Sequence, residues 1–541
     1  MNCTILRIDP YYSIRNDEKR EVMTIENLEN LKTAIIDIGS NTIRLVLYKY
    51  NRLEGLREFG NIKTVARLRT YLQRDGEMSE EGILLLSKTL NSFKSIIDDY
   101  EITDIKATAT AAIRQAKNNE SIIARMEKDT GILIDLLTEE EEAYFGFIAV
   151  AHSMDTESAV TIDIGGGSTE ITLFEDKKLQ KTISFPFGTV SLKEKFVSGE
   201  VINTEEKVLL QQFVKAQFES LDWISQIGLP VVAIGGSGRN IAQVHQHLVD
   251  YPLSGVHQYE MEMGELNNIS SYLETLTFEQ LKQLDGLSSD RADIIGIALE
   301  VFRTLMATVQ AKSFQISKKG LREGLIYSRV LQNDSNAFNK YNVFEDYARR
   351  ISFEYGRSEQ ECELLSELTE QFYRECCRLG IFHFNEKHLQ LLKRAAKVFG
   401  IGEYIEQDSH NQHTFYLLAN QSIAGMNHVE RVKLALLASY KNKDYFRRLS
   451  APFTSWISRE ELKILKEYGA MLKFIYALNV SKRNIVESIE IEKIDDAIHV
   501  IVEALHIPMA EIYQAERQKK HIERLFKKPI QIHFYKKGEK R

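Results

Sequence analysis

The chain has 541 residues, of which 43% are hydrophobic and 27% charged, the proportions of an ordinary globular protein. This length predicts three or four domains of about 100–200 residues each. The net charge of -8 excludes an overall basic surface of the kind that binds nucleic acid, and four cysteines are too few for a disulfide framework. We therefore expect a cytoplasmic protein without a nucleic-acid partner.

The order of apolar and polar segments predicts the domain organisation. Residues 1–32 are polar, lack the apolar core of a signal peptide and are expected to form an N-terminal extension. From residue 33 to residue 330, short apolar runs alternate with longer stretches of helical pattern, which predicts an α/β architecture. Residues 331–340 (LQNDSNAFNK) are polar, and we expect a linker there. No run reaches the ~20 apolar residues of a membrane span, so we expect none.

Beyond the linker, apolar residues recur at helical spacing, which predicts a helical domain at 341–450. A small α+β domain is expected at 458–541, with strands at 485–491 and 497–504 between helices at 460–477 and 509–526. The final residues, KKPIQIHFYKKGEKR, are basic, and we expect a solvated tail; guidance of a polyanion is the alternative.

One pattern occurs twice in the first half of the chain. The segments IIDIGSNTIRLVLY (residues 35–48) and TIDIGGGSTEITLF (residues 161–174) align without a gap. Each has an apolar run ending in Asp-x-Gly, a turn of small residues and a second run that alternates with period two, so each is expected to form a β-hairpin. A third glycine-rich turn, GGSG at 235–238, follows another apolar run.

These turns have the composition of phosphate-binding loops, because glycines let backbone amides approach an anion and hydroxyl groups add hydrogen-bond donors. A plain tight hairpin is the alternative for any single turn, but three turns, two of them in register, favour phosphate binding. Two lobes opened by such hairpins would face each other across a shared cleft. The predicted phosphate-binding residues are Ser40, Asn41, Thr42, Arg44, Gly166, Gly167, Ser168, Gly236 and Ser237.

The paired turns resemble those of the superfamily of actin, sugar kinases and heat-shock chaperones, which has a ribonuclease H-like fold. The motifs that follow the first turn resemble, in the same order, those of the exopolyphosphatase and guanosine pentaphosphate phosphohydrolase family. They read ATAAIR (109–114), EEA (141–143), DIGGGSTE (163–170), FGTV (187–190), GGSG (235–238), DGL (285–287), RAD (291–293) and GLREG (320–324). The resemblance implies two actin-like α/β lobes, at 33–154 and 155–330.

The resemblance also implies roles for single residues. Glu142 would be the base that orients the attacking water, although the residues alone favour an acidic helix start over a catalytic role. Asp163 and Glu170 would hold Mg²⁺, with another divalent cation or K⁺ as alternatives, and Arg114 would contact phosphate oxygens. The remaining charged residues of the motifs are expected to be structural or to lie at the cleft rim, or to pair and pack; they are Asp285, Arg291, Asp293, Arg322 and Glu323.

These roles imply an enzyme that removes the terminal phosphate of inorganic polyphosphate as orthophosphate. Hydrolysis of guanosine pentaphosphate (pppGpp) to the tetraphosphate (ppGpp), a reaction of the stringent response, is the alternative, and a regulatory protein that binds these nucleotides with weak catalysis is another. The additional domains suit a long substrate and favour polyphosphate. We expect a homodimer supported by the helical domain.

Residues 391–443 resemble the helical domain that family members share with metal-dependent phosphohydrolases having a His-Asp pair. The position of that pair is occupied here by Phe399 and Gly400, which cannot ligate a metal. His410 and His413 remain, three residues apart, and we predict that they pack or lie on the surface. The sequence therefore predicts an HD-like domain without a second metal site.

Overall fold

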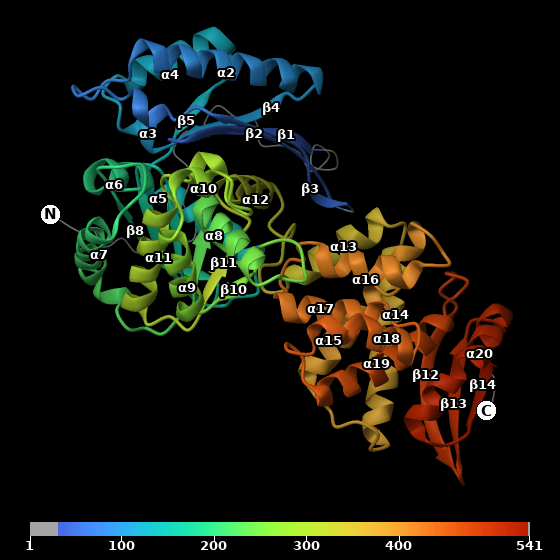
Figure 1. Cartoon of the computed structure of the whole chain (residues 1–541). Helices are drawn as coiled ribbons and strands as arrows, with labels where there is room; N and C mark the ends of the chain where they lie inside the picture. Colours follow the sequence, from blue (N-terminus) through green and yellow to red (C-terminus); the bar gives the residue numbers. More distant parts are fainter. Residues whose placement is uncertain (1–30, 53, 539–541) are drawn as a thin grey trace. The chain divides into compact units, whose positions relative to one another are not determined.

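The computed structural model describes residues 31–52 and 54–538 (Figure 1). The chain divides into two compact units. The first extends to Val343 but excludes Pro252–Gly255, and the second consists of Pro252–Gly255 and Phe344–Arg541. The expected N-terminal extension falls outside the described residues, except that Leu31 and Lys32 open the first strand. No helix among the described residues is both long and apolar enough to cross a membrane.

The first lobe is built on a five-stranded sheet in the order β3-β2-β1-β4-β5. β1, β2 and β3 form an antiparallel meander, and β4 and β5 continue the sheet in parallel with β1. The strands are β1 (Leu31–Ile38), β2 (Thr42–Asn51), β3 (Gly55–Val65), β4 (Asp104–Ala109) and β5 (Ile134–Leu136), and the helices are α2 (Glu80–Asp99), α3 (Ala111–Arg114) and α4 (Asn119–Thr130).

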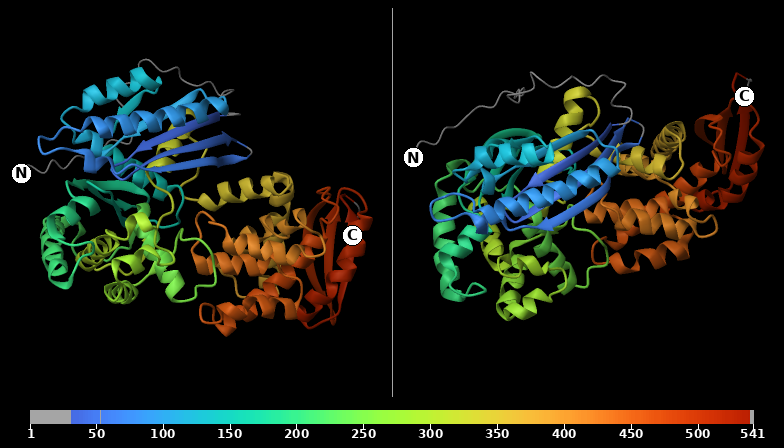
Figure 2. Two further views of the ribbon diagram at one scale, coloured as in Figure 1. Left: turned by 45° about the horizontal axis from the view of Figure 1, so that its top comes forward. Right: turned by 90° about the horizontal axis from the view of Figure 1, so that it is seen from above.

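The alternation predicted for β2 is what places this strand between two cores. Ile43, Leu45 and Leu47 are fully buried in the core that α2 covers, and α2 lies across this face of the sheet (Figure 2). Val46 and Tyr48 point to the opposite face and pack with residues of α5 (Glu139–Ala151) and α12 (Leu321–Asn333). Period-two alternation sends the side chains of this strand to both faces of the sheet, and both faces are apolar because helices cover each of them.

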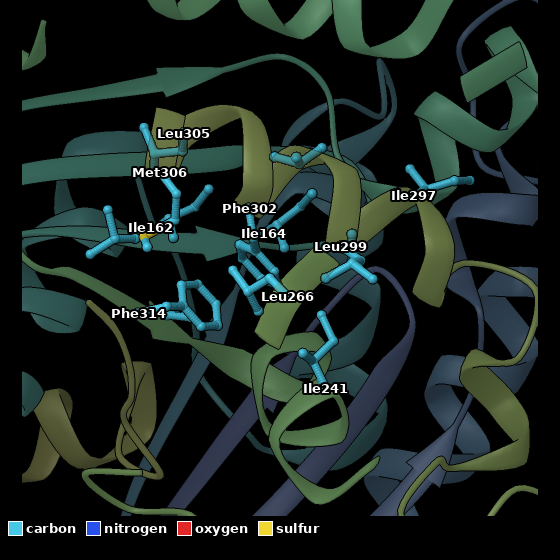
Figure 3. Packing of buried hydrophobic residues seen from close by; sticks show 14 of the residues in the cluster. Ile162, Ile164, Ile241, Leu266, Ile297, Leu299, Phe302, Leu305, Met306 and Phe314 are labelled. Carbon is cyan, nitrogen blue, oxygen red and sulfur yellow. The ribbon is translucent and has the colours of Figure 1, made fainter. Parts of the chain in front are cut away.

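The second lobe has a six-stranded sheet in the order β10-β11-β9-β6-β7-β8. Ile162 and Ile164 of the sheet pack against Phe302 and Leu299 of α11 (Ile295–Val309) in the core of this lobe (Figure 3). The strands are β6 (Ala159–Ile164), β7 (Thr169–Glu175), β8 (Lys178–Phe185), β9 (Val231–Ile234), β10 (Glu260–Met261) and β11 (Phe314–Ile316). The helices are α6 (Thr189–Phe196), α7 (Thr204–Glu219), α8 (Gly235–Leu248), α9 (Met263–Glu274), α10 (Phe278–Lys282) and α11 (Ile295–Val309).

The repeated motif forms the same hairpin in both lobes, as predicted. β1 pairs with β2 so that Asp37 lies opposite Arg44, and β6 pairs with β7 so that Asp163 lies opposite Glu170. The third glycine-rich turn is different, because β9 leads directly into helix α8 at Gly235.

The helices α5 and α12 touch at Gly324. A Cβ atom built there would lie 2.6 Å from the carbonyl carbon of Phe145, and closer still to its oxygen. This backbone contact excludes any larger residue and fixes α12, which starts at the cleft, against α5, which carries Glu142. α12 continues to Asn333, so the predicted linker was placed too early: Leu331–Asn333 are helical, and the irregular connection begins at Asp334.

The second unit begins with helices and ends with a three-stranded sheet in the order β12-β13-β14. The helices are α13 (Val343–Glu354), α14 (Glu359–Arg378), α15 (Glu386–Lys397), α16 (His410–Asn420), α17 (His428–Ala438), α18 (Lys443–Ser450), α19 (Arg459–Ala477) and α20 (Met509–Phe526). The strands are β12 (Val486–Ile494), β13 (Ala497–Ala504) and β14 (Ile530–Lys536).

The prediction of a solvated C-terminal tail was wrong for Ile530–Lys536, which forms strand β14 beside β13. Ile530, Ile532 and Phe534 alternate with polar residues, but the flanking lysines obscured that pattern. In the helical part, Phe399 and Ile401 are buried, and His413 contacts the hydroxyl of Ser409 at 2.9 Å. Within the described residues, no three His, Cys, Asp or Glu side chains are grouped to hold a metal; the absence of a second metal site stays a prediction.

Candidate functional site

A cavity of about 420 Å³ lies between the two hairpin turns of the first unit. Its wall comes from the turns β1–β2 and β6–β7, from the starts of α5, α8 and α12, and from β3. Of the predicted site residues, those that line it are Ser40, Asn41, Thr42, Arg44, Glu142, Asp163, Gly166, Gly167, Ser168, Glu170 and Gly236. The fold therefore brings together residues spread over nearly 200 positions of the chain, including most of the predicted set.

The two hairpin turns are similar in backbone geometry and touch each other. The amide of Gly39 donates to the carbonyl of Thr42 at 3.1 Å, and the amide of Gly165 donates to that of Ser168 at 3.0 Å. A Cβ atom on Gly166 would come within 3.2 Å of the Cβ of Ser40. Glycine at this position therefore lets the turns of the two lobes approach closely.

The start of α8 forms the third wall of the cavity. Gly235 has a φ of 88°, and a Cβ atom there would lie 2.7 Å from a carboxylate oxygen of Asp163. The next residue, Gly236, lies against Arg291, whose guanidinium carbon would be 2.5 Å from an added Cβ. Ser237, a predicted phosphate ligand, does not line the cavity and accepts a hydrogen bond from Arg291 at 3.2 Å.

Four carboxylates gather where the turns meet: Asp37, Glu142, Asp163 and Glu170. Burial raises the pKa of Asp163 to about 6, with Arg239 opposing that shift. Burial, reinforced by the charge of Asp163, raises the pKa of Glu170 to about 7. Burial also raises the pKa of Asp37. Burial therefore disfavours the charged form of these carboxylates.

A divalent cation would stabilise the charged form of these buried carboxylates. Asp163 and Glu170 are cross-strand neighbours that both face the cavity, and oxygen is the ligand that hard cations prefer. Although four carboxylates line this part of the cavity, no three His, Cys, Asp or Glu side chains among the described residues are grouped closely enough to hold one metal ion. An ion such as Mg²⁺, which commonly keeps several of its waters, would therefore be held by these two carboxylates together with water and substrate oxygens.

The run of four acids at the start of α5 divides into separate roles. Thr138 and Glu141 form a reciprocal capping box, the side chain of each accepting a hydrogen bond from the backbone of the other. Glu142, the next residue, lines the cavity. Its pKa is raised well above its usual value by burial and by the charge of Glu170. Helix capping thus accounts for Glu141 but not for Glu142.

Arg114 lies against Glu142 rather than in the cavity wall. Its guanidinium donates a hydrogen bond to the Glu142 carboxylate and another, at 2.7 Å, to the carbonyl of Leu137. Arg114 therefore opposes the rise in the pKa of Glu142 and orients that side chain. In this structure Arg114 is a hydrogen-bond partner of Glu142, whereas the sequence analysis predicted that Arg114 contacts phosphate oxygens.

The cavity has a positive wall that the sequence analysis largely missed. Besides Arg44, its cations are Lys63, Arg239, Arg291, Lys318 and Arg322. Burial and the neighbouring Arg322 lower the pKa of Arg239 to about 10, so cations are crowded together here. Arg239 directly follows the GGSG turn, which could have singled it out, whereas Lys63 and Lys318 carried no such signal.

Arg322 and Glu323, neighbours at the start of α12, have different main partners. Glu323 accepts a hydrogen bond from the amide of Gly320 at 2.9 Å and from the hydroxyl of Tyr48 at 3.4 Å, so it caps the helix. Arg322 faces the cavity and is attracted most strongly to Asp37. Asp285 is an exposed residue paired with His247 at 3.3 Å. Of the motif residues without assigned chemistry, Arg291, Arg322 and Glu323 therefore line the cavity.

Family models match both units of this chain. The model of the Ppx/GppA phosphatase family matches residues 47–333, and the model of domain III of the Ppx/GppA phosphatases matches residues 356–521. The chain belongs to the Ppx/GppA phosphatase family. This confirms the predicted family and enzyme class, a hydrolase acting on phosphoanhydride bonds.

Curated relatives carry two different names. A guanosine-5'-triphosphate,3'-diphosphate pyrophosphatase of Pseudoalteromonas atlantica is 25% identical over 407 residues, covering 74% of this chain and 77% of that protein. Exopolyphosphatase 1 of Mycobacterium tuberculosis is 25% identical over 305 residues, covering 56% of this chain and 88% of its own length. These relatives therefore leave the substrate of this chain undecided.

Solved structures establish the fold of the two lobes. The crystal structure of the Aquifex aeolicus member of the Ppx/GppA family has a TM-score of 0.51 at 26% identity and covers 56% of this chain and 99% of that one. An exopolyphosphatase from Cytophaga hutchinsonii has a TM-score of 0.51 at 20% identity and covers 56% of this chain and 98% of that one. The predicted actin-like α/β fold is confirmed for the lobes.

Proposed function

We propose that this chain is an exopolyphosphatase, which hydrolyses the terminal phosphoanhydride bond of inorganic polyphosphate and releases orthophosphate. The observation that carries the proposal is the cavity in which two phosphate-binding turns, a cluster of carboxylates and a wall of cations meet. Such a site combines backbone donors with guanidinium and ammonium groups, as a polyanionic substrate requires.

In the proposed reaction, Glu142 accepts a proton from a water molecule as the water oxygen attacks the terminal phosphorus. The bond between that phosphorus and its bridging oxygen breaks, and the shortened chain leaves with the bridging oxygen. The raised pKa makes the Glu142 carboxylate a stronger base than an exposed glutamate, and Arg114 holds it in place. A divalent cation at Asp163 and Glu170 would supply electrostatic stabilisation of the phosphoryl group.

The positive wall provides the remaining stabilisation in this scheme. Arg44, Arg239 and Arg322 come from three separate elements and face the same cavity. Phosphoryl transfer depends mainly on positioning and on neutralising charge on the equatorial oxygens. Guanidinium groups fixed by a rigid fold meet both needs, since their fork geometry binds two oxygens of one phosphate.

Hydrolysis of guanosine pentaphosphate to the tetraphosphate is the second candidate. Similarity to the Pseudoalteromonas atlantica relative extends over 74% of this chain, compared with 56% for the mycobacterial exopolyphosphatase. The same turns and carboxylates would serve either substrate, because both present a terminal phosphoryl group. Cytoplasmic location, a homodimer, Mg²⁺ as the ion in the cell and a role in the stringent response stay predictions.

One assay tests the reaction and compares the two substrates. The protein is incubated with Mg²⁺ and long-chain polyphosphate, guanosine pentaphosphate or ATP, and released phosphate is measured. We expect Glu142→Gln to lower kcat by a factor of about 10²–10⁴, the usual contribution of a general base. Glu140→Gln is the matched control, because Glu140 is an exposed residue two positions away that does not line the cavity.

Three results would contradict parts of the proposal. Phosphate release from ATP alone would reject both substrates. Release from guanosine pentaphosphate but not from polyphosphate would replace the first candidate with the second. An equal rate for Glu142→Gln and Glu140→Gln would remove Glu142 from its role as the base.

A further inference from the structure

A second cavity of about 280 Å³ adjoins the first. Ser40 and Asn41 of the first hairpin turn, together with Ile294, line both cavities. An anion held by the first turn is therefore next to both spaces. Three cations line the second cavity: Arg67 and Arg69 from the first lobe and Lys193 from the second.

The segment that carries Arg67 and Arg69 is fixed to the first turn by its backbone. The amide of Arg67 donates to the carbonyl of Asn41 at 2.9 Å, and the amide of Arg69 donates to the carbonyl of Ser40 at 3.2 Å. Arg67 has a φ of 45°, a left-handed conformation that non-glycine residues seldom adopt. The chain thus turns sharply so that two arginines in three residues lie beside the phosphate-binding turn.

The side chain of Arg69 reaches from the first lobe to the turn of the second. A Cβ atom on Gly167 would lie 2.8 Å from an Nη atom of Arg69, so the guanidinium lies directly over this glycine. The same Nη atom donates to the side-chain oxygen of Gln115 at 2.6 Å. Arg69 is therefore next to both phosphate-binding turns.

Three acids line the second cavity, Glu194, Asp290 and Asp293, and the last two are paired with cations other than Arg69. Asp290 pairs with Lys63 at 3.0 Å, and Asp293 pairs with Lys193 at 2.9 Å. The guanidinium of Arg67 donates to the backbone carbonyl of Asp290 at 3.4 Å and lies 4.0 Å from the carboxylate of Asp293. The contacts of Lys63 and Arg67 with Asp290 and Asp293 join the two lobes. Of the three cations that line the second cavity within the described residues, Arg69 is the one without a contact to either of these aspartates.

The positive charge of Arg69 has little compensation from nearby acids, although this side chain is only 19% exposed. Its ion-pair partner is Glu194, 4.0 Å from Nε and itself 58% exposed. Its Nε atom is buried and has no hydrogen-bond partner within residues 31–52 and 54–538. A largely enclosed guanidinium without a close carboxylate is unfavourable, and a bound anion would compensate it.

We propose that Arg69, with Arg67 and Lys193, forms a second anion subsite that binds the phosphates following the terminal one in a linear substrate. This inference rests on the proposed function and deepens it, because a second subsite favours chains longer than the first cavity holds. Arg69 acts there as a direct phosphate ligand.

Binding is measured calorimetrically in the Glu142→Gln background, so that substrate is not consumed. The probes are long-chain polyphosphate and pyrophosphate, which is too short to extend past the first turn. We expect Arg69→Gln to weaken binding of the long chain about tenfold, the effect of losing one charge-assisted hydrogen bond of about 1.5 kcal/mol, and to leave pyrophosphate binding within about twofold.

Two further variants sharpen the comparison. Arg74→Gln is the matched control, because Arg74 is an exposed arginine nearby in sequence that lines neither cavity, and we expect no change. Gln115→Glu places a carboxylate beside the guanidinium of Arg69 and is expected to weaken long-chain binding as Arg69→Gln does. It tests the subsite independently if Arg69→Gln lowers the thermal midpoint.

The subsite is rejected if Arg69→Gln weakens both probes equally or neither. It is also rejected if Gln115→Glu leaves the affinity for the long chain unchanged. A protein that binds the long chain through Arg69 but releases no phosphate from any substrate would retain the subsite and reject the proposed function. The two conclusions can therefore fail separately.

Discussion

The contact between α5 and α12 predicts the effect of one added methyl group. In Gly324→Ala, the new Cβ would lie 2.6 Å from the carbonyl carbon of Phe145, whereas nonbonded carbon atoms normally stay about 3.5 Å apart. The obstacle is backbone, so no side-chain rotation relieves it. Because the carbonyl oxygen of Phe145 is closer still, the two helices must separate by at least about 1 Å, the difference between the two carbon distances.

This displacement affects both stability and the site. Overpacking of this kind costs about 1–3 kcal/mol, and each kcal/mol lowers the melting temperature by about 2–4 °C in a domain of 150–250 residues. Glu142 lies in the first turn of α5 and Arg322 in the first turn of α12. Since a shift of about 1 Å at a catalytic group can cost about 10²-fold in rate, we expect kcat to fall by that order.

Thermal unfolding and phosphate release measure the two effects. Gly264→Ala is the matched control, because Gly264 is an exposed glycine near the start of α9 and an added Cβ atom would meet nothing within 4 Å. That variant should be unchanged or more stable by up to about 1 kcal/mol. If Gly324→Ala melts and turns over like the unmodified protein, the helix contact does not position the site.

Three further outcomes follow from single residues. Asp163→Asn should weaken Mg²⁺ activation of phosphate release by at least about tenfold, because a carboxylate ligand is lost; an unchanged Mg²⁺ titration would contradict its role. Thr138→Ala should destabilise the protein by about 1 kcal/mol in urea unfolding, because it removes the cap of α5, while Ser95→Ala, at an exposed position of α2, should have little effect. Burial lowers the pKa of His152 from 6.5 to about 3, so only the unfolded state gains a proton as the pH falls below 6.5, and stability falls with it. His152→Phe should reduce that slope by up to about 1.4 kcal/mol per pH unit, and an equal slope in both proteins would contradict the buried neutral imidazole.

Much of the fold could be predicted because its signals are local. The hairpins at Asp37–Arg44 and Asp163–Glu170 follow from apolar runs, small turn residues and period-two alternation. The two helices predicted for the C-terminal domain, at 460–477 and 509–526, agree within one residue with α19 (Arg459–Ala477) and α20 (Met509–Phe526). Strand β14 was missed because its apolar residues are few and lie among lysines, and its partner β13 is separated from it by α20.

The site could be predicted only in part, since hydrogen bonds between distant residues leave no sequence pattern. Glu142 was found from a motif, but its pairing with Arg114 depends on how α3 and α5 lie beside each other. Arg322 was expected to pair and pack, yet α12 begins at the cavity and turns this side chain toward Asp37.

The repeated turn was determined by the sequence itself, because a tight turn depends on the conformational freedom of its own few residues. The sequence also determined the period-two strands and the helix caps, which involve neighbours in the chain. Tertiary structure alone decided which cations surround the turns and which acids are buried beside them. Charges far apart in sequence acquire their pKa and their partners only when folding removes them from water and brings them together, as Asp163 and Arg239 show.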